Sequence, residues 1–153
     1  MKFKEAVTYD DMLLVPQYSD ITSRSEVDIS SALNVTRRLQ LPIMASPMDT
    51  VSEVDMAVAM AKAGGLAVIH RYNSVVEQGR LVSLAAAAIS NITVDPVIAA
   101  AIGVSGDYLE RATTVVALGA NVLCVDVAHG HHIMMKNALQ ELRKAFGDDI
   151  YII

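Results

Sequence analysis

The chain has 153 residues, of which 53% are hydrophobic and 19% charged, with a formal net charge of -5 and a single cysteine. This composition provides enough apolar material for one buried core and excludes a disordered chain, and one cysteine excludes an intramolecular disulfide framework. The acidic balance, with no Lys/Arg cluster beyond Arg37-Arg38, lacks the electrostatic pattern of a nucleic-acid-binding protein.

The apolar residues come in short runs, and none approaches the roughly 18 consecutive positions that a membrane span needs. The start of the chain, MKFKEAVTYDD, has no apolar stretch behind its two lysines, so we expect no secretory signal. These features predict a cytoplasmic protein without a membrane partner.

Residues 1–40 are rich in turn-forming residues and contain one apolar patch, Met12 to Val15, which ends at Pro16. We expect a lead-in segment wrapped on the core.

From residue 41 onward, short apolar runs alternate with helical stretches. The runs are LPIMA (41–45), GLAVI (65–69), VIAAAI (97–102), NVLCVD (121–126) and DIYII (149–153). They are almost continuously apolar, which is typical of parallel strands covered on both faces. The predicted helices between them are 53–63, 75–89, 107–118 and 132–146.

The ends of these helices carry capping signals. Ser52 with Asp55, and Ser74 with Glu77, have the spacing of a capping box. Three glycines stand where a left-handed residue would end a helix: Gly64, Gly119 and Gly147.

A strand–helix repeat of this kind predicts right-handed βαβ crossovers in an α/β fold. Five parallel strands and four helices fit about half of an eight-stranded (β/α)8 TIM barrel, which needs roughly 250 residues. We therefore expect a single incomplete barrel domain over 1–153, with 1–40 as lead-in and 41–153 as βα repeats. A doubly wound five-stranded sheet is the alternative that composition leaves open.

Ligands of parallel α/β folds bind at the carboxyl ends of the strands, and a polar segment follows each of the first four predicted strands. These segments are residues 46–50, 70–73, 103–107 and 126–132. The first, SPMDT, offers a hydroxyl, backbone amides and a soft apolar side chain, which suit a nucleotide; turn formation and helix capping explain it equally well. His70 and Arg71 could meet an anionic ligand or only cover the end of the sheet.

Asp126 could accept hydrogen bonds from a ribose diol, or could cap the helix that begins near 132. The histidines at 129, 131 and 132 invite a metal hypothesis, which we reject because no carboxylate or cysteine lies at ligand spacing. Cys124 should lie about 6.6 Å deeper than Asp126 along its strand and be an inert core cysteine. The GVSG sequence at 103–106 is neither a P-loop nor a dinucleotide fingerprint.

Several segments together resemble the IMP dehydrogenase and GMP reductase family. They are TYDDMLLVPQYSDI (8–21), SRSEVDIS (23–30), LPIMASPMDTVSE (41–53), MAVAMAKAGGLAVIHRYNS (56–74), AAIGVSGDYLERA (100–112) and NVLCVDVAHGHH (121–132). ASPMDTVSE combined with DVAHGHH is the specific part of this likeness, and it favours the dehydrogenase over the reductase. The resemblance implies a TIM barrel and a place in purine (GMP) biosynthesis.

In such dehydrogenases a cysteine thiolate attacks C2 of IMP, hydride passes to NAD, and water releases XMP. The resemblance places Ser46, Met48 and Asp49 at the purine nucleotide, IMP or GMP. For the dinucleotide side it implies Asp126, Val127, Ala128 and Ser105.

The resemblance also implies what this sequence lacks. The family's catalytic cysteine loop, phosphate loops and potassium site correspond to none of these residues, so we expect no catalytic residue and no metal site here, and no regulatory CBS modules. Two hypotheses follow: a truncated or split enzyme that needs a complementary C-terminal half-barrel, or a non-catalytic nucleotide-binding remnant that forms homo-oligomers. An unrelated small α/β ligand-binding module is a third.

Overall fold

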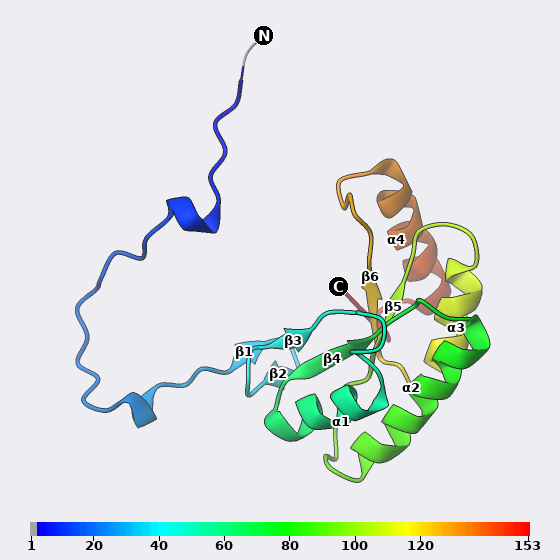
Figure 1. Ribbon diagram of the computed structural model, residues 1–153, viewed down its shortest axis with the longest axis horizontal. Helices are drawn as coiled ribbons and strands as arrows, with labels where there is room; N and C mark the ends of the chain where they lie inside the picture. Colours follow the sequence, from blue (N-terminus) through cyan, green and yellow to red (C-terminus); the bar gives the residue numbers. More distant parts are fainter. Residues whose placement is uncertain (1–2) are drawn as a thin grey trace.

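The computed structural model describes residues 3–153; residues 1 and 2, the start of the segment in which we expect no secretory signal, lie outside them. Four α-helices pack on one parallel sheet (Figure 1). The helices are α1 (Val54–Ala63), α2 (Val75–Ser90), α3 (Tyr108–Ala117) and α4 (Ile133–Phe146). Their predicted boundaries are each correct to within one residue. No helix in residues 3–153 is long and apolar enough to cross a membrane.

The main sheet contains five parallel strands in the order β3-β4-β5-β6-β7, which is also their order along the chain. They are β3 (Met44–Ala45), β4 (Leu66–Ile69), β5 (Ala99–Ile102), β6 (Val122–Val125) and β7 (Tyr151–Ile152). Each lies inside one of the five predicted apolar runs. A doubly wound sheet reverses its strand order at a switch point. The unbroken order therefore excludes that alternative and matches consecutive units of a barrel.

The two faces of the sheet bury different residues. The odd positions of β4, such as Ala67 and Ile69, pack with the helices in the larger core cluster. The even positions, such as Leu66 and Val68, face the opposite, inner side together with Ala99 and other small residues of the second cluster. The strand residues of both clusters are thus buried, which explains why the strands are almost continuously apolar.

A short antiparallel hairpin covers part of the inner face, and the sequence did not predict it. Its strands are β1 (Ser31–Ala32) and β2 (Arg38–Leu39). Leu39 is buried among inner-face residues, and Leu33 packs beside it. Arg37 ties the hairpin to the loop before β5 through two hydrogen bonds to the Asp95 carboxylate, at 3.3 and 3.1 Å.

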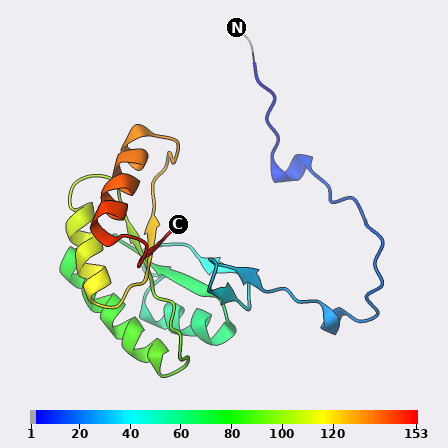
Figure 2. The ribbon, with the colours of Figure 1, turned by 180° about the vertical axis from the view of Figure 1, so that it is seen from behind.

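The expected wrapping of the lead-in segment on the core is wrong for residues 3–29. This arm leaves the body of the molecule with only two 3-10 turns, Tyr9–Asp11 and Arg24–Glu26 (Figures 1 and 2). Its apolar patch is exposed, with Leu13 at 93% and Leu14 at 98%. The side chains of this patch therefore remain mostly exposed instead of packing on the core.

The predicted caps have mixed outcomes. Ser74 is confirmed as the N-cap of α2, because its side chain accepts a hydrogen bond from the Glu77 amide at 3.1 Å. Ser52 is not the cap of α1: its hydroxyl instead donates to the Ser46 carbonyl, and Glu53 occupies the N-cap position. Gly64 ends α1 in the left-handed conformation at φ 81°, as predicted.

Candidate functional site

The carboxyl ends of the five parallel strands meet at one edge of the sheet, and the predicted polar segments follow them there. Strand alternation points Ser46, His70 and Asp126 toward the inner side of this edge, because each continues the even-numbered positions of its strand. We call this region the strand-end site. It brings together segments separated by up to 80 residues in the chain (46 to 126).

The segment from Ser46 to Glu53 forms a tight loop between β3 and α1. The Ser46 carbonyl accepts hydrogen bonds from the Met48 amide, at 2.8 Å, and from the buried Ser52 hydroxyl. Thr50 has a positive φ of 59°, which is uncommon for a residue other than glycine. These bonds leave the Ser46 side chain exposed and hold the Met48 side chain 56% exposed.

His70, at the end of β4, holds this loop in place. Its backbone amide donates to the Ser52 carbonyl at 3.3 Å. Its buried imidazole accepts the Tyr72 amide at Nδ1 (3.2 Å) and lies 3.1 Å from the Glu53 carboxylate at Nε2. Because Nδ1 is an acceptor, the hydrogen bonds assign the proton to Nε2, which then donates to Glu53.

Asp49, Glu53 and His70 are the one group in residues 3–153 with three metal-type ligand atoms within 4.8 Å of one another. The hydrogen bonding argues against a metal ion there. A metal on Nε2 would require the ring proton to move to Nδ1, where it would face the Tyr72 N–H donor. The three histidines at 129, 131 and 132 form no such group, and His132 instead caps α4 through Nδ1, 3.1 Å from the Met134 amide.

Asp126 directly follows β6 at the strand-end site. Its amide donates to the Ile102 carbonyl at 2.9 Å, and its carbonyl accepts from Arg71 Nη2 at 3.1 Å. Its carboxylate makes no hydrogen bond to any described residue, so the capping role considered for it falls to His132. The carboxylate remains available as an acceptor.

The other residues assigned to the dinucleotide side border Asp126 or the neighbouring strand. Val127 is partly buried and Ala128 exposed directly after it, and Ser105 is exposed in the loop that follows β5. Along the sheet, these residues follow β5 and β6, two and three strands away from β3 and its Ser46 loop.

A buried polar network beside the ends of β4 and β5 was not predicted. The Gln78 side chain donates to the Ala101 and Ile69 carbonyls at 2.8 and 3.3 Å and accepts from Arg111 Nη1 at 3.0 Å. Arg111 also binds Asp107 at 2.8 Å, and this bond holds the pKa of the Asp107 carboxyl below its usual value. The sequence signal that could have predicted this network is the presence of a glutamine and an arginine at positions that face the core on two neighbouring helices.

Cys124 is half-buried on the inner face, beside Ala101 in the sheet register. Burial, and then the nearby charge of Asp126, raise the pKa of its thiol. A thiol with a raised pKa carries little thiolate at neutral pH and is a poor nucleophile. The expectation of an inert cysteine below the strand ends agrees with this environment.

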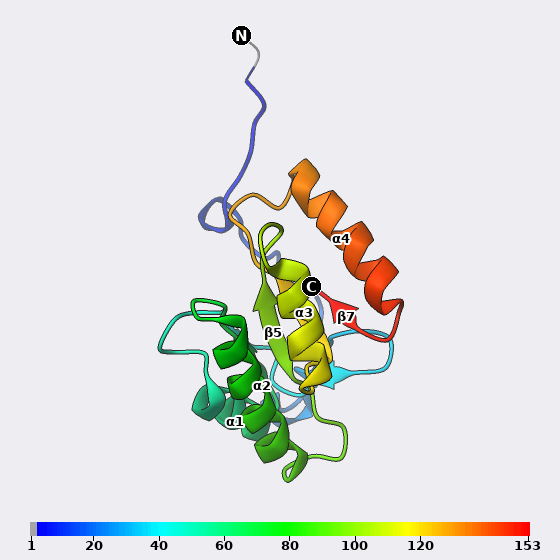
Figure 3. The same ribbon diagram turned by 90° about the vertical axis from the view of Figure 1, so that its right-hand side faces the viewer.

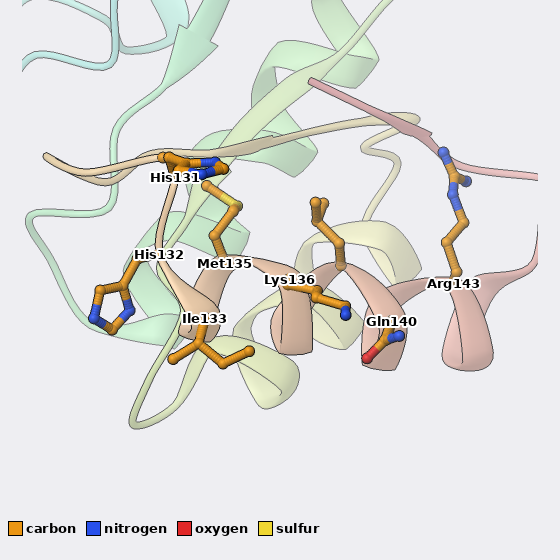
Figure 4. Close-up of a pocket in the computed structure, with 9 residues that line it drawn as sticks. His131, His132, Ile133, Met135, Lys136, Gln140 and Arg143 are labelled. Atoms are coloured by element: carbon orange, nitrogen blue, oxygen red, sulfur yellow. The ribbon is translucent and has the colours of Figure 1, made fainter.

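A groove of about 680 Å³ runs along α4 from the end of the polar segment 126–132 (Figure 4). It is lined by His131, Ile133 and Met135 near the start of the helix and reaches Arg143. None of Ser46, Asp49 or Asp126 lines it. Because α4 stands at the end of the helical layer, beyond α3, the groove is the face that no neighbouring helix covers (Figure 3).

Comparison with known proteins gives a family match over almost the whole chain. The model of the IMP dehydrogenase / GMP reductase domain matches residues 6–153. The inosine-5'-monophosphate dehydrogenase of Nitrosopumilus maritimus is 53% identical over 78 residues, and the GMP reductase of Leishmania donovani 45% identical over 92 residues. These stretches cover 51% and 60% of this chain but only 16% and 19% of the two relatives.

Among solved structures, the GMP reductase from Trypanosoma brucei in complex with guanosine 5'-triphosphate superposes with a TM-score of 0.84. The superposition covers 98% of this chain and 66% of the other, at 21% sequence identity. It confirms the predicted fold, a partial (β/α)8 barrel with five parallel strands and four helices.

Proposed function

Because this chain belongs to the IMP dehydrogenase / GMP reductase family, we propose that it supplies the N-terminal strand ends of a purine nucleotide oxidoreductase that converts IMP and NAD to XMP and NADH. The observation that carries this proposal is the convergence of the Ser46 loop and Asp126 at one edge of the sheet. The SPMDT and DVAHGHH sequences favour the dehydrogenase reaction over the reductase reaction.

The Ser46 loop is our proposed contact for the purine nucleotide. Its backbone is held by internal hydrogen bonds, so the Ser46 hydroxyl and the Met48 side chain can face a ligand without rearrangement. Asp49 lies 3.8 Å from His70 Nε2 and supports the loop beside them. We assign hydrogen bonding to Ser46, apolar contact with the base to Met48, and loop support to Asp49.

The residues that follow β5 and β6 fit a nicotinamide dinucleotide. The Asp126 carboxylate has no hydrogen-bond partner among the described residues, which suits it to accept two hydrogen bonds from a ribose diol. Ser105, Val127 and Ala128 border the same position. When bound, the nicotinamide supplies the hydride acceptor of the reaction.

We propose that the cysteine nucleophile of the reaction does not come from residues 1–153. Cys124, the single cysteine, is half-buried two positions below the strand end and has a raised pKa. We therefore propose that residues 1–153 act as one incomplete barrel domain, inactive until further βα units complete it. The edge of β7 and the groove along α4 are the surfaces against which such units, or a second copy, would pack.

A GMP reductase reaction is the second candidate, because relatives of both names match at similar identity. That reaction consumes NADPH, so the two candidates are distinguished by the nucleotide pair that is turned over.

The test is to assay the chain alone and the chain co-expressed with the C-terminal half-barrel of a family dehydrogenase. We expect NADH formation from IMP and NAD only in the pair, and its loss in Ser46→Ala and Asp126→Asn. Ser83→Ala, an exposed change on α2, is the matched control. NADPH oxidation with GMP would identify the reductase. An assembled pair without either activity would refute the catalytic proposal and favour a nucleotide-binding remnant.

A further inference from the structure

We propose that Arg71 is a phosphate anchor of the strand-end site that binds the diphosphate of the dinucleotide. This inference rests on the proposed function and adds to it a residue and a ligand group.

Arg71 stands where both sides of the site meet. It follows His70 at the end of β4, and its Nη2 donates to the Asp126 carbonyl at 3.1 Å. A methyl group placed on Gly103 would touch Arg71 Cζ and Nη1 at 3.6 Å, so the guanidinium lies against the end of β5. The side chain is therefore held across the ends of three neighbouring strands.

The hydrogen-bonding capacity of Arg71 is mostly unused. A guanidinium has five N–H donors, and the described residues accept one of them. Its Nε is buried and has no hydrogen-bond partner among residues 3–153. A buried donor without an acceptor is costly, so this position favours a ligand that brings acceptor oxygens.

The charges around Arg71 point to an anion. No carboxylate oxygen of residues 3–153 lies within 4.0 Å of its guanidinium, whereas the other arginine at this edge, Arg111, is bound to Asp107 at 2.8 Å. The same edge carries the carboxylates of Asp49, Glu53 and Asp126. A phosphate entering an edge with these negative charges requires a cation, and the Arg71 guanidinium forms no ion pair with a carboxylate of residues 3–153, although its charge helps to lower the pKa of the nearby Asp107 carboxyl.

Its position selects the diphosphate over the phosphate of the purine nucleotide. Arg71 contacts Asp126 and Gly103, which border the dinucleotide side, and it makes no hydrogen bond to the Ser46 loop. The arginine would thus fix the dinucleotide at its charged centre while the Asp126 carboxylate holds a ribose.

The experiment is a titration of the ¹⁵N-labelled chain with NAD, ADP-ribose and IMP, following the arginine Nε–H and backbone amide signals. We expect NAD and ADP-ribose to shift the Arg71 Nε–H signal. Arg71→Gln should raise the Kd for both by about 10- to 100-fold, the range for losing a hydrogen bond to a charged group, and change the Kd for IMP less than twofold. Arg71→Lys, which keeps the charge, should lose less affinity than Arg71→Gln.

Arg80→Gln is the matched control, because Arg80 is an exposed arginine bound to Glu77 on α2. NAD affinity within twofold of wild type in Arg71→Gln, or an equal loss for IMP, would overturn the proposal. If NAD shifts the Asp126 amide but not the Arg71 signal, only the anchor is refuted. If no nucleotide shifts the amides of Ser46 or Asp126, the proposed function fails and the anchor with it. Arg71→Lys supplies the comparison if Arg71→Gln does not fold.

Discussion

Replacing Gln78 by leucine should destabilise the protein by about 2 kcal/mol. The side chain is fully buried and makes three hydrogen bonds: two to carbonyls at the ends of β4 and β5, and one from Arg111. Losing the bond to the charged guanidinium costs about 1.5–3 kcal/mol and each neutral bond about 1 kcal/mol. Burial of the leucine side chain offsets roughly 2 kcal/mol of this.

The measurement is urea unfolding followed by far-UV circular dichroism, at one fixed protein concentration because self-association would couple to folding. With an m-value of about 2 kcal/mol/M, the midpoint should fall by about 1 M. Gln17→Leu, in the exposed arm, is the control and should stay within about 0.5 kcal/mol of wild type. A Gln78→Leu midpoint equal to that of the control would show that the network contributes nothing net. Our account also requires a coupling energy between Gln78 and Arg111 in a double-mutant cycle with Arg111→Met, and an absence of coupling would contradict it.

Three further predictions concern single residues, and one concerns assembly. Ser74→Ala should cost about 1 kcal/mol in the same unfolding assay, because the Glu77 amide loses its cap acceptor; no change would contradict the cap. The hydrogen bond from Arg111 lowers the pKa of Asp107, so the pair stabilises the folded state above the ordinary aspartate pKa of about 3.9, and this stabilisation is lost as the pH falls through the lower pKa of the folded state. Asp107→Asn should therefore lose less stability on acidification than wild type. An unaltered dependence of stability on pH in this variant would refute the role of the pair. The raised pKa of Cys124 predicts slow alkylation by iodoacetamide at neutral pH that accelerates only in alkali, so a rate like that of a free cysteine would contradict its burial. The uncovered β7 edge and α4 groove predict light-scattering masses above 16.4 kDa, and a sharp monomer would count against this expectation.

The sequence predicted the repeating part of the fold well because its determinants are local. Strands buried on both faces must be continuously apolar, and a helix that turns back to the sheet needs a residue such as Gly64 at its end. The order of the polar segments along the chain was then enough to place Ser46 and Asp126 at the same edge.

The failures concern features that depend on partners distant in sequence. Ser52 has the spacing of a cap, yet its hydroxyl bonds the Ser46 carbonyl, because the loop folds back on itself after β3. The β1–β2 hairpin has a turn residue, Asn34, whose side chain accepts from the Thr36 and Arg37 amides, but its position depends on the inner face of the sheet, where Leu39 is buried. The acceptor role of His70 Nδ1 follows from the Tyr72 amide, which sequence spacing does not reveal.

The agreement between strand order and chain order has a consequence for synthesis on the ribosome. Every strand of the main sheet after the first pairs with the one made just before it, so each newly emerged strand meets an edge that is already formed. Assembly can proceed in one direction from the amino-terminal side, without waiting for a distant segment to be translated. Apart from the edge of β3, which stays free throughout, the free edge at each stage is that of the newest strand, so the tendency to aggregate during synthesis should change as each strand is added.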